Sequence, residues 1–82
     1  MKVKLTLFAG ARDKVGSDSV ELQFPEASIT VADVRKSLID TCPVLEPLAP
    51  HLHFALGTEY IGNDYPVADG AELVCFPPVS GG

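Results

Sequence analysis

The last six residues of the chain, Pro77 to Gly82, carry the chemistry that the sequence offers most clearly. Because glycine has no Cβ, Gly81 and Gly82 leave a backbone slim enough to enter a narrow slot. Each of the two prolines before them fixes φ at about −65° and removes an N–H, which favours an extended lead. The carboxylate of Gly82 is then a handle for activation as an acyl adenylate, followed by conversion to a thiocarboxylate or an isopeptide. The alternative interpretation is a frayed chain end without a role.

Other residues of the kinds that carry chemistry form no recognisable site. His51 and His53 are two positions apart, but no ligand set of the usual spacing surrounds them, so we expect no metal. We expect Cys42 and Cys75 to be buried apolar residues rather than a disulfide, and no His or Lys lies near Cys75 in sequence to activate its thiol. No pair of acidic residues is placed for acid–base work, so an internal active site is not expected.

Charge is distributed unevenly along the chain, whose formal net charge is −5. All six Lys and Arg residues lie within the first 36 positions, and six acidic residues but no basic ones follow. Nucleic-acid binding through the acidic half is disfavoured, because phosphate neutralisation needs Lys and Arg. One interpretation of this half is a partner protein with a basic surface. The other is that the acids keep a small domain soluble.

The length of 82 residues corresponds to one small domain. No apolar run approaches the roughly 20 residues that a membrane helix needs. The short apolar stretch near Met1 is interrupted by polar residues too early for a signal peptide. We therefore expect a soluble, cytoplasmic protein that does not bind a membrane.

Apolar and polar residues alternate at several points, which is the period of a strand with one face on a core. Val3, Leu5 and Leu7 alternate in this way near the start, and Pro25 ends a second alternating run. Strands are predicted over residues 2–8, 20–24, 54–56, 60–61 and 72–76.

One main helix is predicted between the second and third strands. Thr30 and Asp33 resemble a capping box with Asp in place of the usual Glu, and apolar residues then recur at helical spacing. We expect this helix over residues 31–41, ended by Pro43.

The remaining segments are expected to be short or irregular. A single helical turn is expected over residues 11–14, and the proline-rich segment 43–50 is expected to be irregular or one turn. A single long helix covers only one face of a sheet of four or five strands, so the pattern predicts an α+β domain with one open face.

The following stretches are informative when they are taken together: Leu7-Phe8-Ala9, Ala11-Arg12, Val15-Gly16, Pro66-Val67, Asp69-Gly70-Ala71-Glu72-Leu73-Val74 and Phe76-Pro77-Pro78-Val79-Ser80-Gly81-Gly82. Through them the whole chain resembles the small subunits of molybdopterin synthase, a family of ubiquitin-like sulfur carriers. The sequence departs from the family at Leu56-Gly57-Thr58-Glu59, where an Asn-containing turn is frequent, which leaves the conformation of the loop over 57–65 open.

The resemblance implies a β-grasp, ubiquitin-like fold over residues 1–77 and an extended Gly-Gly tail over residues 78–82. It also implies that the first and last strands are parallel, central neighbours. If so, Phe8, Val74 and Phe76 gather on the open face just before the tail, with Tyr60 at the rim. A contiguous exposed apolar patch is typical of a protein interface.

The function implied by the resemblance is sulfur transfer in molybdenum cofactor biosynthesis. An adenylyltransferase would use ATP to adenylate Gly82, a sulfur donor enzyme would convert the adenylate to a thiocarboxylate, and the tail would enter the large catalytic subunit. Pro77 and Pro78 would give the tail its stiffness and reach, and Val79 and Ser80 would belong to the same tail. The chain would bind no cofactor itself, and catalytic residues would belong to the partner, so its sulfurtransferase activity would be that of the complex.

Three alternatives remain open at this point. A sulfur carrier for thiamine or tRNA thiolation would share the fold and the Gly-Gly end. A ubiquitin-like protein modifier would place Gly82 in an isopeptide bond with lysine side chains. A plain interaction module would use the open face and leave the chain end unmodified.

Overall fold

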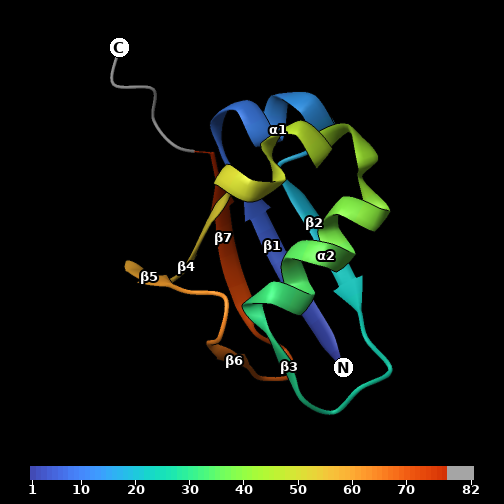
Figure 1. Ribbon diagram of the computed structural model, residues 1–82, viewed down its shortest axis with the longest axis vertical. Helices are drawn as coiled ribbons and strands as arrows, with labels where there is room; N and C mark the ends of the chain where they lie inside the picture. The colour runs from blue at the N-terminus through green and yellow to red at the C-terminus, as the bar shows by residue number, and fades with distance from the viewer. Residues whose placement is uncertain (78–82) are drawn as a thin grey trace.

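Alternating apolar residues build a mixed sheet in the computed structural model, which describes residues 1–77 (Figure 1). Val3, Leu5 and Leu7 of the first strand are at most 1% exposed, whereas the residues between them face outward. The elements in chain order are β1 (Lys2–Leu7), α1 (Ala9–Val15), β2 (Ser19–Gln23), β3 (Ile29–Thr30), α2 (Val31–Thr41), the 3-10 helix η1 (Pro43–His51), β4 (His53–Leu56), β5 (Glu59–Ile61), β6 (Pro66–Val67) and β7 (Glu72–Phe76).

The strand order within the described residues is β2-β1-β7-β4-β5, with β3 and β6 forming a separate pair. Strands β1 and β7 run parallel, and the other neighbours in the main sheet are antiparallel. This confirms the predicted α+β, β-grasp class, including the parallel pairing of the first and last strands. Helices α1, α2 and η1 lie on one side of the sheet (Figure 1). Their buried residues join the sheet in one core: Ala11, Val31, Val34, Leu38 and Leu45.

The main helix has the bounds that the sequence predicts, because its end signals are local. The Asp33 carboxylate accepts a hydrogen bond from the backbone N–H of Thr30 at 2.9 Å, which completes the capping box. Pro43 follows the helix end and begins η1. The 43–50 segment, predicted to be irregular or one turn, is thus part of a 3-10 helix over Pro43–His51.

Several predicted boundaries were wrong by one or two residues. The first strand ends at Leu7, and Phe8 is the N-cap of α1, with extended backbone angles of φ −125° and ψ 157°. Helix α1 is longer than the single turn expected, because Gly16 adopts φ 80° and closes it with an N–H bond to the Arg12 carbonyl. The second strand is shifted to Ser19–Gln23. The pair β3 and β6 was not predicted, because a strand of two residues is too short to show an alternation of apolar and polar residues.

The Arg35 side chain connects α2 to the segments that follow it in the chain. The Arg35 Nη1 donates to the carbonyls of Ala49 at 2.6 Å and Leu52 at 2.8 Å. Its Nη2 donates to Asn63 Oδ1 at 3.0 Å, and the guanidinium carbon lies 5.0 Å from the centre of the Phe54 ring. Arg35 is therefore a clamp that fixes η1 and the 62–65 turn against the helix.

We expect Arg35→Met to lower the free energy of unfolding by about 2–3 kcal/mol, because two carbonyls lose a charged donor. Urea denaturation measures this change. Lys36→Met is the matched control, since Lys36 is an exposed cation on the same helix. If both variants unfold at the same urea concentration, Arg35 is not a clamp.

Candidate functional site

The sheet face opposite the helices is arranged in rows by strand register. Thr6 lies opposite Val74 across the parallel pair, and Val74 lies opposite Ala55. Ala55 in turn lies opposite Tyr60. Residues that are directly opposite in a sheet project to the same face, so this row crosses the open face from β1 to β5.

An aromatic cluster formed by His53, Tyr60 and Phe76 occupies one end of this face. His53 lies opposite Phe76 in register, and their ring centres are 5.6 Å apart. The Tyr60 ring centre is 5.3 Å from that of Phe76 in an edge-on arrangement and 5.9 Å from that of His53. Tyr60 is 68% exposed, so the cluster presents a large aromatic surface to solvent.

Of the predicted patch residues, Phe76 and Tyr60 belong to this cluster, whereas Phe8 and Val74 lie beside it. Phe8 is 46% exposed, and its N–H donates to the Cys75 carbonyl at 3.1 Å, next to the end of β7. Its extended backbone continues the alternation of β1, which places the side chain on the open face with Val74 and Phe76. Tyr60, predicted at the rim, contacts Phe76 directly.

His53 was not predicted to belong to this surface. From the sequence it was considered only together with His51, and no metal was expected at the pair; His51 lies in η1 and His53 in β4. The signal that would have identified His53 is its register with Phe76, which depends on a pairing between distant segments.

The chain passes from the aromatic cluster directly to Pro77. A Cβ placed on Gly10 would lie 3.7 Å from Pro77 Cγ, so Pro77 packs against the start of α1. The end of β7 accordingly lies beside α1 (Figure 1). The predicted tail residues Pro78, Val79, Ser80, Gly81 and Gly82 lie outside the described residues, and the division of the chain at residue 77 stays a prediction.

The far end of the open face is charged rather than apolar. Lys4 lies opposite Glu21 on one side and opposite Glu72 on the other. The Lys2 Nζ is 3.5 Å from Glu21 Oε1, in a pair that is more than half exposed. The face therefore changes from alternating charges to aromatic residues along β7, toward Pro77.

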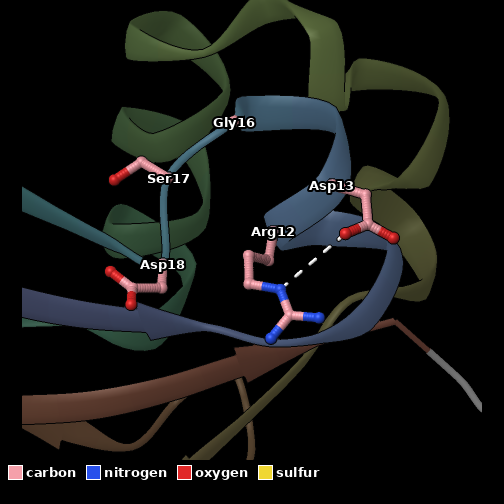
Figure 2. Close-up of a pocket in the computed structure, with 5 residues that line it drawn as sticks. All are labelled: Arg12, Asp13, Gly16, Ser17 and Asp18. Carbon is pink, nitrogen blue, oxygen red and sulfur yellow. Dashed lines mark ion pairs between the residues drawn. The ribbon is translucent and has the colours of Figure 1, made fainter.

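A shallow polar pocket is lined by Arg12, Asp13 and residues 16–18 (Figure 2). The Arg12 Nε is 3.7 Å from Asp13 Oδ1, while Ser17 and Asp18 point away from this pair (Figure 2). Among residues 1–77, no group of three or more His, Cys, Asp or Glu could hold a metal ion.

Cys75 is buried in the core, as the sequence predicts. Burial raises the pKa of its thiol from 9.0 to about 12, and the positive charge of Arg35 opposes this shift. The unfolded chain loses this proton near pH 9, whereas the folded protein keeps it. Burial of the neutral thiol therefore stabilises the fold below pH 9, and this contribution is lost as the pH rises toward 12.

We expect Cys75 in the folded Cys42→Ser variant to react with a thiol reagent at pH 8 at least about 100-fold more slowly than in the urea-unfolded variant. The Cys42→Ser substitution removes the second thiol, which is half-buried, so the measured rate of reaction with the reagent reports Cys75 alone. Equal rates in the folded and unfolded protein would contradict the burial of a protonated thiol.

Within the described part of the chain, the helices are too short or too polar for any of them to cross a membrane.

Comparison with known proteins gives a consistent result. The sequence matches the ThiS family over residues 5–82. It is 33% identical over 82 residues to the molybdopterin synthase sulfur carrier subunit of Arabidopsis thaliana, covering 100% of this chain and 84% of that protein.

Solved structures agree with the fold. The crystal structure of SAMP1 from Haloferax volcanii superposes with a TM-score of 0.86 and 29% identity, covering 100% of both chains. A crystal structure of the small archaeal modifier protein 1 of H. volcanii gives a TM-score of 0.83 and 28% identity, covering 95% of this chain and 98% of that chain.

Proposed function

The chain belongs to the ThiS family, and from this premise we propose that it is a sulfur carrier of molybdenum cofactor biosynthesis. In this proposal the carboxyl group of Gly82 is converted to a thiocarboxylate, which donates its sulfur to a pterin precursor held in the large subunit of molybdopterin synthase. The observation that carries the proposal is the similarity to the Arabidopsis sulfur carrier subunit along the whole of this chain.

Activation at Gly82 follows from the chemistry of the carboxylate. A free carboxylate resists nucleophiles, so an adenylyltransferase first joins it to the AMP portion of ATP, with release of pyrophosphate. A sulfur donor enzyme then supplies sulfide-level sulfur, which attacks the acyl carbon, expels AMP and leaves a thiocarboxylate. The thiocarboxylate sulfur attacks the precursor inside the partner, and hydrolysis of the resulting thioester leaves the sulfur on the precursor and returns Gly82 to a carboxylate. ATP is thus used by the activating enzyme, and this chain needs no cofactor of its own.

The open face supplies the docking surface in this proposal. The aromatic cluster and Phe8 lie beside Pro77, immediately before the predicted tail. Contact between this surface and the large subunit would set how far the tail reaches into the partner. Holding the sulfur at one place provides the proximity that makes the transfer effectively unimolecular.

In this proposal the domain acts as a sulfur donor, and its own thiol takes no part in the transfer. Its buried thiol, Cys75, is protonated at neutral pH because its pKa is about 12. The acids and bases that act on the precursor would then belong to the large subunit. The cytoplasmic location expected from the sequence stays a prediction.

A second candidate function is conjugation to other proteins. It is favoured by the similarity to a protein named small archaeal modifier protein 1. In that case the activated Gly82 carboxyl would form an isopeptide bond with a lysine amine. Immunoblots of lysate from the native cell would then show a ladder of heavier conjugates.

The intact mass of the chain purified from its native cell tests the proposal. We expect a fraction of the molecules to carry sulfur in place of one oxygen at Gly82. An unmodified Gly82 carboxylate in every molecule, together with a ladder of conjugates on the immunoblot, would favour the modifier instead. A polypeptide that continues beyond Gly82 would contradict both.

A further inference from the structure

A small apolar pocket lies on the helix side of the sheet, where residues of β4, β6, β7 and the adjoining loops meet. Leu56 and Leu73 of the main sheet line it from one side, and Tyr65 and the β6 strand line it from the other. Its volume is about 290 Å³. Pockets for drug-sized molecules begin at about 300 Å³, so this pocket suits a single large side chain.

The pocket has an apolar floor and an apolar rim that is open to solvent. Leu73 is 2% exposed and forms part of the floor, whereas Leu56 and Tyr65 are each 40% exposed. Covering such a rim removes apolar surface from water and is therefore favourable. The core packing of the domain leaves this surface uncovered.

The pocket is separate from the aromatic cluster. Leu73 and Val74 are consecutive residues of β7, so their side chains project to opposite faces. The same holds for Leu56 and Ala55 of β4. A partner seated on the open face therefore leaves the pocket accessible.

Three acidic residues adjoin residues that line the pocket, either in strand register or in sequence. Glu59 lies directly opposite Leu56 in register and shares its face. Asp64 immediately precedes Tyr65 in the chain. Asp69, in the loop after β6, accepts a hydrogen bond from the Lys2 backbone N–H at 2.8 Å. Among the described residues, the Lys2 Nζ forms its ion pair with Glu21, at 3.5 Å, and not with Asp69.

We propose that this pocket is a second docking site, which takes one large apolar side chain from a partner protein segment with Lys or Arg on both sides of it. The apolar lining selects the anchor, and the acidic surroundings select the flanking charges. This inference goes beyond the sulfur-carrier proposal, because it needs neither Gly82 nor the open face.

Three capped heptapeptides test the proposal by NMR titration of the isotope-labelled full chain. The first has a central phenylalanine between two serines, with two lysines at each end. The second has glutamates in place of the lysines, and the third has alanine in place of phenylalanine. We expect the first to shift the amide signals of Leu56, Tyr65 and Leu73 with a Kd of roughly a millimolar, to which the buried side chain and the flanking charges both contribute.

The matched peptides and variants decide between outcomes. We expect the glutamate and alanine peptides to bind at least about tenfold more weakly, because each lacks one of the two required features. Leu56→Asp and the rim variant Tyr65→Ser should weaken binding of the first peptide to a similar extent. Either variant is sufficient for the test if the other does not fold. Val44→Asp, on an exposed apolar residue of η1, should bind normally.

Several results would overturn the second docking site. These are equal binding of the lysine and glutamate peptides, equal binding of the phenylalanine and alanine peptides, or shifts confined to His53, Tyr60 and Phe76. Phe76→Asp alters the open face and should leave peptide binding unchanged. The outcome for the pocket therefore does not depend on the docking surface of the sulfur-carrier proposal.

Discussion

Deletion of Gly82 is expected to abolish productive sulfur transfer while leaving the melting temperature unchanged. Removing one residue withdraws the terminal carboxyl by about 3.5 Å, and a misplacement of 1 Å alone costs about 10²-fold in rate. The buried apolar residues of the described chain run from Val3 to Cys75, so the deletion removes none of these residues.

The measurement for this deletion has three parts. Intact mass after incubation with ATP, the activating enzyme and a sulfur donor reports loading, its loss after addition of the large subunit and the pterin precursor reports transfer, and thermal unfolding reports stability. Ser80→Ala is the control, because it alters the tail without moving the terminal carboxyl, and it should load normally. Normal transfer by the deletion variant, or a fall of several degrees in melting temperature, would contradict the proposed role of Gly82.

The success of the sequence prediction depended on whether the signals were local. Helix α2 was predicted to its exact residues because Thr30, Asp33 and Pro43 mark its ends within the chain itself. The strands β1 and β7 were predicted to within one residue because their alternation is regular. That these two strands are parallel neighbours was predicted from the family resemblance and not from the alternation of apolar and polar residues.

The features that escaped prediction depend on contacts between distant segments. His53 joins Phe76 and Tyr60 only through the registers of β4 with β7 and with β5. The Arg35 clamp depends on the path of η1, which brings the Ala49 and Leu52 carbonyls together at one guanidinium. Neither arrangement can be predicted from the spacing of residues in the sequence.

Strand β7 explains how so small a domain combines a core with a binding surface. Leu73 and Cys75 are buried, while Val74 and Phe76 project to the open face. The strand then continues into Pro77, which packs at Gly10. The residues that hold the sheet together and the residues that would contact a partner therefore alternate along one rigid element beside the predicted tail.

Phe76→Asp is expected to weaken binding to the large subunit of molybdopterin synthase by about 100-fold, which corresponds to the loss of an aromatic side chain near the centre of an interface. Phe76 contacts both His53 and Tyr60, so the substitution disrupts the aromatic cluster as well as adding a charge. The domain should remain folded, because Phe76 is only half-buried and lies outside the buried core.

Titration calorimetry with the purified large subunit measures this loss, and Val44→Asp provides the matched control. Val44 is an exposed apolar residue of η1, on the helix side of the sheet, and it receives the same new charge. Its affinity should equal that of the unaltered chain. If Phe76→Asp folds and binds as tightly as Val44→Asp, the open face is not the docking surface, because the aromatic cluster cannot lie at the centre of an interface and tolerate a buried carboxylate.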